Sequence, residues 1–125
     1  MSRRFSYADA AALMPQVRQV AAEIVETRAE LAELSSALNG GEESPLGGVA
    51  EMKALEARLH ELLSWFGANG IEVKGAAPVI IDFPGTLLGA DVLLCWLEGE
   101  TELAWYHRPE LGFLGRRPLP PEAMR

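Results

Sequence analysis

Cysteine, histidine and basic residues are all scarce in this chain of 125 residues. Its one cysteine, Cys95, cannot form a disulfide within the chain, and its apolar neighbours suit a buried thiol in a reducing compartment. Lys and Arg number 11 against 18 Asp and Glu, which gives a net charge of −7. Because binding to a nucleic-acid backbone requires a concentrated basic face, we expect no nucleic-acid partner.

Long apolar runs are also lacking. No segment approaches the roughly 18 apolar residues of a membrane-spanning helix, and the N-terminus has no uninterrupted apolar stretch of the kind found in signal peptides. We therefore expect no membrane association and a cytoplasmic location. The only nitrogen and sulfur side chains suited to zinc are those of His60, Cys95 and His107, on separate predicted elements, and no phosphate-binding glycine motif is present. The sequence predicts no metal and no cofactor.

The first half of the chain has helical spacing. Ser6 followed by Asp9 is typical of a helix N-cap and places a helix start at about Tyr7. Because a proline ring clashes with the preceding helical turn, Pro15 predicts that a short helix ends near Met14 and a longer one begins. Two apolar stripes with three- and four-residue spacing follow, separated by Gly40, Gly41 and the loop Glu42-Glu43-Ser44-Pro45. Residues 1–69 are therefore expected to form an antiparallel, coiled-coil-like helical hairpin.

After Gly70 the spacing changes to that of strands. Apolar, β-branched and aromatic runs bounded by turn residues predict an antiparallel meander of three to four strands over residues 70–108, followed by an irregular tail over residues 109–125. A two-residue turn at Gly99-Glu100 would pair residues whose numbers sum to 199, so that Cys95 faces Ala104 and Asp91 faces Arg108. The chain is predicted to be one α+β domain.

Both faces of this predicted sheet are largely apolar, so one face needs a cover besides the helices. This cover is either the C-terminal tail or a second copy of the chain, and a homodimer is the preferred cover. Another protein is a further possible partner. The leading functional hypothesis is a non-enzymatic interaction or scaffold module that self-associates. The residues expected at its interface are Trp96, Trp105, Ile24, Leu31 and Leu59.

A second hypothesis rests on the strand ends. In a meander, the end of one strand lies beside the start of the next, which groups polar side chains at one end of the sheet. His107 and Asp82 are the candidate catalytic residues, and Arg116, Arg108 and Asp91 are candidate ligand contacts. They would suit a small-anion-binding protein or a hydrolase-like enzyme. Asp82 and His107 lie two strand steps of about 4.8 Å apart, so the sequence does not decide whether they form a direct hydrogen bond. The plainer alternative is that Asp82 caps a turn, His107 bonds to the backbone and Arg116 holds the tail in place.

Acidic residues form two further groups. Glu98, Glu100 and Glu102 surround the predicted turn, and Glu23, Glu26, Glu30 and Glu33 lie along one side of the long helix. Both groups are expected to be solvated, although the helical row also suits a basic partner.

Several motifs in order along the chain resemble a known family. They are Phe5-Ser6 with Ala10 and Leu13 before Pro15, Gly70-Ile71-Glu72-Val73-Lys74, Asp82-Phe83-Pro84, Leu94-Cys95-Trp96, Gly99-Glu100, Trp105, His107, Gly112-Phe113, Gly115-Arg116 and Pro118. Together they resemble the small bacterial domain-of-unknown-function family 2203 over nearly the whole length. The resemblance supports the predicted fold and implies no established activity.

Overall fold

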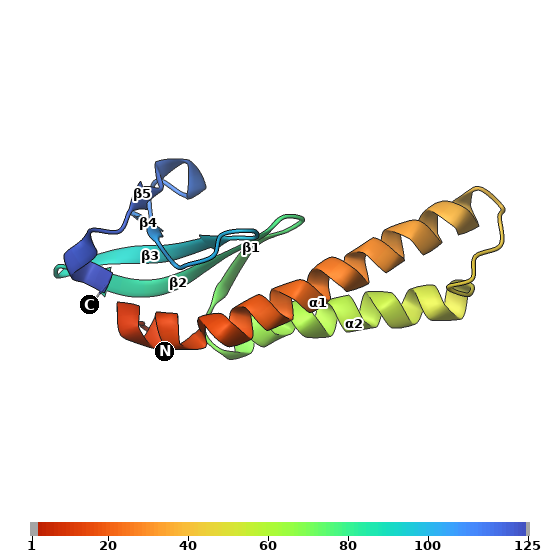
Figure 1. Ribbon diagram of the computed structural model, residues 1–125, viewed down its shortest axis with the longest axis horizontal. Coiled ribbons are helices and arrows are strands. Elements are labelled where there is room, and N and C mark those ends of the chain that lie inside the picture. Colours follow the sequence, from red (N-terminus) through yellow and green to blue (C-terminus); the bar gives the residue numbers. More distant parts are fainter. Residues whose placement is uncertain (1–2, 125) are drawn as a thin grey trace.

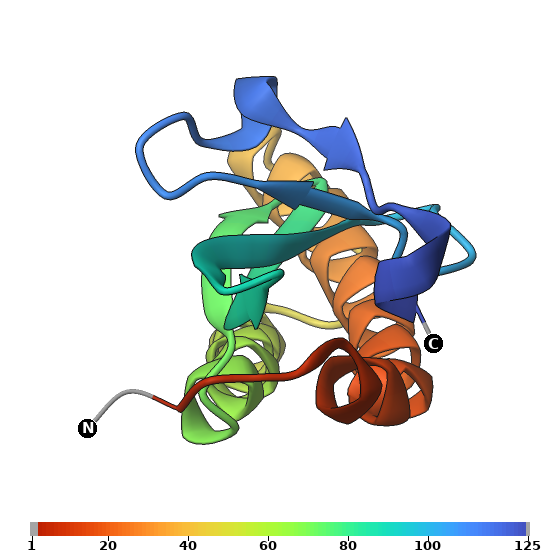
Figure 2. The ribbon, with the colours of Figure 1, turned by 90° about the vertical axis from the view of Figure 1, so that its left-hand side faces the viewer.

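The computed structural model describes residues 3–124 as a long helical hairpin followed by a five-stranded antiparallel sheet. The sheet order β1-β2-β3-β4-β5 follows the chain. Figures 1 and 2 show the helices on one face of the sheet and the last residues of the chain reaching back beside the start of the first helix. The α+β prediction is confirmed, with more strands than the three to four expected. The elements are α1 (Tyr7–Asn39), α2 (Val49–Ala68), β1 (Glu72–Ala76), β2 (Val79–Leu87), β3 (Ala90–Leu97), β4 (Trp105–His107), the 3₁₀ turn η1 (Phe113–Gly115), β5 (Arg117–Pro118) and the 3₁₀ turn η2 (Pro121–Met124).

Helix α1 begins as predicted but does not restart at Pro15. The Ser6 hydroxyl accepts a hydrogen bond from the Asp9 backbone N–H at 3.0 Å, which satisfies one free donor of the first turn. Pro15 lies inside one continuous helix, so the predicted break near Met14 is wrong. Met14 and Val17, on either side of the proline, are both buried in the core. Burying each such side chain is worth about 1.5–3 kcal/mol, which offsets the cost of about 3 kcal/mol for proline in a helix.

The helical hairpin extends well beyond the sheet (Figure 1). Helix α2 begins where the Gly48 N–H donates to the Glu51 carboxylate at 2.7 Å. Near the sheet, α2 buries Leu62 and Phe66, whereas the distal part of α2 has no fully buried side chain. Neither helix of the described residues is long and apolar enough to cross a membrane.

The face of the sheet toward the helices forms the core. Ile81 and Phe83 on β2 are fully buried there, beside Leu94 and Trp96 on β3. The N-terminal segment closes this core: the Phe5 N–H donates to the Pro84 carbonyl at 2.7 Å, and the Phe5 ring meets Phe83 edge to face at 5.1 Å. Alternation along the strands places Asp82 and Cys95 on the opposite, outer face.

The register between β3 and β4 differs from the prediction by one residue. Leu93 pairs with His107 and Cys95 pairs with Trp105, so paired numbers sum to 200 rather than 199. The two-residue turn is wrong because residues 98–104 form a longer loop, in which Glu100 accepts a bond from the Leu97 N–H at 2.8 Å. A one-residue slip reverses the face of every side chain on a strand. Cys95 and His107, predicted on opposite faces, therefore lie on the same face.

The C-terminal segment is more regular than the predicted irregular tail. Strand β5 pairs with β4, with Tyr106 opposite Arg117 and Trp105 opposite Pro118. The Leu119 N–H donates to the Ala104 carbonyl at 2.8 Å, and the Leu119 side chain is buried in the core. This segment therefore adds a short edge strand to the sheet.

Candidate functional site

Asp82 and His107 form a buried pair on the outer face of the sheet. Asp82 lies on β2 and His107 on β4, and their side chains meet across β3. His107 Nε2 lies 3.0 Å from Asp82 Oδ2, and each side chain is only 2% exposed. The direct contact that the sequence left open is therefore present. Because both side chains reach toward the middle strand, the spacing of two strand steps does not separate them.

The hydrogen bonds of His107 determine how many protons the pair holds. His107 Nδ1 lies 3.0 Å from the Arg108 carbonyl, which can only accept, so Nδ1 carries a hydrogen. The other nitrogen faces a carboxyl oxygen. One further proton must lie between Nε2 and Oδ2, either as imidazolium with carboxylate or as neutral imidazole with carboxylic acid. In both forms the buried pair has no net charge.

Cys95 completes a group of three possible ligands on this face. One ligand atom each from Asp82, Cys95 and His107 lie within 4.8 Å of one another, and all three residues are buried. Burial, reinforced by the Asp82 carboxylate, raises the pKa of the Cys95 thiol to about 12. Among residues 3–124, nothing donates a hydrogen bond to Asp82 Oδ1, although this atom is buried. Cys95 is buried, as the sequence predicts. Its cross-strand partner is Trp105 and not the predicted Ala104.

Arg116 covers part of the same face. Its guanidinium lies 4.8 Å from the centre of the Trp105 ring and 4.9 Å from that of Phe113. It donates to Glu100 at 2.6 Å and to the Cys95 carbonyl at 3.4 Å. These contacts pin the C-terminal segment to the sheet, and Arg116 makes no hydrogen bond to Asp82 or His107 among the described residues.

Asp91 and Arg108 do not join this group, and their predicted cross-strand pairing is wrong. Asp91 pairs with Arg4 at 3.2 Å, and Arg108 pairs with Glu110 at 3.4 Å. All four side chains are more than half exposed. In the observed register Arg108, one position beyond the last residue of β4, falls opposite Val92 and not opposite Asp91.

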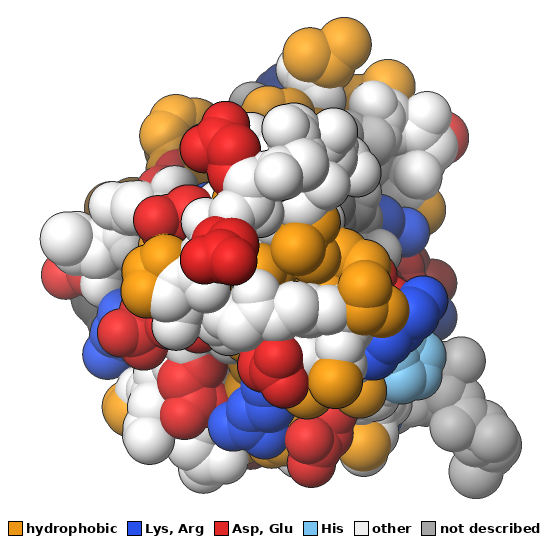
Figure 3. All heavy atoms as spheres, turned by 90° about the vertical axis from the view of Figure 1, so that its right-hand side faces the viewer, with side chains coloured by type: hydrophobic (Ala, Val, Ile, Leu, Met, Phe, Trp, Pro, Cys, Tyr) orange, Lys and Arg blue, Asp and Glu red, His pale blue; other side chains and the backbone are white. Residues whose placement is uncertain are grey.

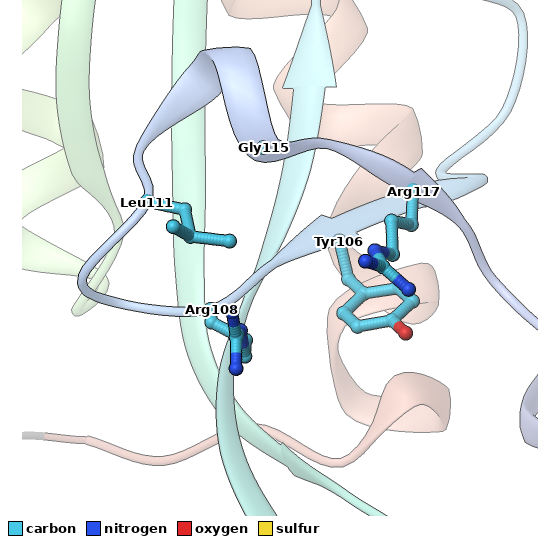
Figure 4. Close-up of a pocket in the computed structure, with 5 residues that line it drawn as sticks. All are labelled: Tyr106, Arg108, Leu111, Gly115 and Arg117. Carbon is cyan, nitrogen blue, oxygen red and sulfur yellow. The ribbon is translucent and has the colours of Figure 1, made fainter.

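Arg108 instead lines a small cavity on the other face of β4 from His107. The cavity holds about 170 Å³ and is lined by Tyr106, Arg108, Leu111, Gly115 and Arg117. Figure 4 shows the Arg117 side chain beside the Tyr106 ring, with Arg108 just past the end of β4 and Leu111 in the loop that follows. The sequence prediction missed Tyr106 and Arg117. Arg117 is positioned by β5, and a strand of two residues is too short to show an alternating pattern in the sequence.

The acidic turn is not solvated in the way predicted. Arg28 of α1 donates two hydrogen bonds to the Glu98 carboxylate, at 2.6 and 2.7 Å, and both side chains are about three quarters buried. These bonds lower the pKa of Glu98 and raise that of Arg28. Glu98 also accepts a bond from the Val79 N–H at 2.9 Å. Glu98 therefore ties the sheet to the long helix, as Glu100 ties it to the C-terminal segment.

The predicted interface residues fall into two groups. Ile24 and Trp96 are in the core, at 0% and 3% exposed, and are not on the surface of the chain. Trp105 lies under the Arg116 guanidinium. Leu31 and Leu59 are half-buried on the helical hairpin.

Comparison with known proteins identifies the family. The DUF2203 profile, described as an uncharacterized conserved protein, matches residues 3–119. The chain belongs to this family. No curated protein and no solved structure matches the chain. The DUF2203 match covers both helices, all five strands and the residues Asp82, Cys95 and His107.

Proposed function

We propose that this DUF2203 protein is a non-catalytic binding module for a small anion with a carboxylate or phosphate group. The proposal rests on two arginines and a tyrosine that line one cavity, Arg108, Arg117 and Tyr106. Guanidinium groups bind such anions through paired hydrogen bonds. A local basic cavity on a chain with net charge −7 is notable because most of the surface repels anions.

The cavity size and charge limit the ligand. At about 170 Å³ it is smaller than the roughly 300–1,000 Å³ of pockets for drug-sized ligands. Glu110 already contacts Arg108 at 3.4 Å, and a bound anion would displace or share that contact. Charge-assisted hydrogen bonds contribute about 1.5–3 kcal/mol each, so two of them correspond to a Kd on the order of 1 mM.

Titration with inorganic phosphate, pyrophosphate and citrate, followed by NMR chemical shifts, tests the proposal. We expect saturable shifts at the backbone amides of residues 106–117 that chloride at equal ionic strength does not produce. Arg117→Gln should weaken binding about tenfold or more, because one charge-assisted bond is lost. Arg58→Gln, on the distant hairpin, is the matched control and should bind normally. Absence of saturable shifts with all three anions would remove the proposal.

Self-association through the hairpin is a second candidate, favoured by the protrusion of the helices beyond the sheet in Figure 1. There, half-buried Leu31 and Leu59 continue the stripe that joins the two helices, and Leu46 and Leu55 line a hollow of about 290 Å³. A second copy would complete a four-helix arrangement over this stripe.

Charge limits this association. Residues 23–61 contain nine Glu against three Lys and Arg, and Figure 3 shows acidic side chains spread over the hairpin end of the molecule. Dimerisation should therefore strengthen toward about 1 M salt, where charges are screened beyond roughly 3 Å. Light scattering at low and high salt measures this. Leu55→Gln should weaken the dimer, whereas Leu88→Gln, at an exposed turn, should not. A wild-type protein that stays monomeric at both low and high salt would exclude the hairpin interface.

A further inference from the structure

From the outer face of the sheet, independently of the anion cavity, we infer that Asp82, Cys95 and His107 form a binding site for a soft divalent metal ion of the Zn²⁺ class. The three residues come from three adjacent strands, β2, β3 and β4, and their ligand atoms lie within 4.8 Å of one another. The sequence predicted no metal because His60, Cys95 and His107 lie on separate predicted elements. The 199 register also placed Cys95 and His107 on opposite faces.

The chemistry of the three donors suits zinc. Zinc binds cysteine sulfur at about 2.3 Å and histidine nitrogen or carboxylate oxygen at about 2.0–2.2 Å, which places tetrahedral ligand atoms roughly 3.4–3.6 Å apart. The widest separation, at most 4.8 Å, would therefore shorten by up to about 1.2–1.4 Å, while His107 Nε2 and Asp82 Oδ2, at 3.0 Å, would move slightly apart. Three protein ligands leave one coordination position open, as in zinc sites that bind water or a small molecule.

The orientation of His107 is that of a metal ligand. A ligating histidine commonly donates its other ring N–H to a backbone carbonyl, which fixes the ring. His107 Nδ1 has this arrangement, with the Arg108 carbonyl at 3.0 Å. Nε2 then faces Asp82 and is the nitrogen that would hold the ion.

Charge and hydrogen bonding also favour an ion at this position. Asp82 Oδ1 is buried without a donor among residues 3–124, and an unpaired buried oxygen is costly. On binding, the ion would replace the proton between Asp82 and His107 and the proton of the Cys95 thiol, and both protons would leave to solvent. A carboxylate, a thiolate and a neutral imidazole then balance the 2+ charge, so the buried site carries no net charge.

The cover over this face has few backbone bonds. Strand β5 contributes two residues, and Arg116 holds the segment through Glu100 and the Trp105 and Phe113 rings. Segments with few backbone bonds open locally at low free-energy cost. Opening of the C-terminal segment would expose Cys95 and give the ion access.

Titration of the reduced, full-length chain with Co²⁺ tests the site, because a Co²⁺–thiolate bond gives a charge-transfer band in the near ultraviolet and a tetrahedral site gives strong visible bands. We expect one Co²⁺ per chain with both features, and displacement of Co²⁺ by Zn²⁺. Cys95→Ser should abolish the charge-transfer band and weaken Zn²⁺ binding about 100-fold or more.

His60 supplies the matched control, since it is the other histidine of the chain and is exposed on α2. His60→Gln should bind Co²⁺ with unchanged affinity and spectrum. The wild-type protein alone can overturn the inference, whatever the variants do to folding: no saturable binding, or binding without the thiolate band, excludes the site. Equal binding by Cys95→Ser, or loss of binding in His60→Gln, would also overturn it.

Discussion

Replacing Asp82 should separate two roles of its side chain, charge and hydrogen bonding. In Asp82→Ala, His107 Nε2 stays buried without a partner, which costs about 1–3 kcal/mol for a neutral imidazole and about 3–5 kcal/mol for an imidazolium. In Asp82→Asn, the amide N–H can donate to Nε2 of a neutral imidazole while Nδ1–H keeps the Arg108 carbonyl. We therefore expect Asp82→Asn to cost only about 1 kcal/mol.

For a domain of 125 residues, a loss of 3–5 kcal/mol lowers Tm by roughly 10–20 °C. Urea unfolding followed by circular dichroism, with a chelator present, measures both variants without interference from metal. Asp91→Ala is the matched control, because its carboxylate is 62% exposed and its pair with Arg4 is worth about 0–1 kcal/mol. Equal costs for Asp82→Ala and Asp82→Asn, or a cost below 1 kcal/mol for both, would refute the buried pair.

Three further predictions concern other contacts. Glu98→Gln should lower the free energy of unfolding by about 1–2 kcal/mol at pH 7, because it weakens the paired bonds to Arg28. Since these bonds lower the pKa of Glu98, the difference between the two proteins should be lost as the pH falls below the ordinary pKa of 4.5. A constant difference in unfolding free energy down to pH 2 would contradict this prediction. Gly85→Ala should destabilise by about 1–3 kcal/mol, because a Cβ there would lie 2.4 Å from the Phe5 carbonyl oxygen, and an unchanged Tm would disprove that contact. The native Cys95 thiol should react with iodoacetamide at pH 8 far more slowly than the thiol of the unfolded chain, because it is buried with a pKa of about 12 and is exposed only while the C-terminal segment is open. Labelling of the folded chain as fast as that of the unfolded chain would show otherwise.

Residue spacing predicts the main division of this fold well. Helical spacing up to Phe66 and alternation after Gly70 correspond to the helical hairpin and the sheet. The Ser6 cap was predictable because a capping hydroxyl acts within four residues of the chain. The continuity of the helix through Pro15 was not predictable, because the burial of its neighbours depends on packing with segments distant in sequence.

The site depended on a register that local residues do not determine. Gly99-Glu100 resembles a two-residue turn, but Glu100 is held by the Leu97 N–H and by Arg116, sixteen positions away. The loop spans residues 98–104, and β4 lies one position away from the register that a two-residue turn would give. Sequence analysis therefore identified His107 and Asp82 as candidates, and it missed Cys95 beside them.

The pairing of β3 with β4 is the most direct test of this account, because it decides whether Cys95 and His107 share a face. Cross-strand nuclear Overhauser effects between backbone protons report that register in solution. The account predicts contacts between residues whose numbers sum to 200, such as Leu94 with Tyr106. Contacts that sum to 199 would place His107 on the opposite face and contradict both the buried pair and the metal site.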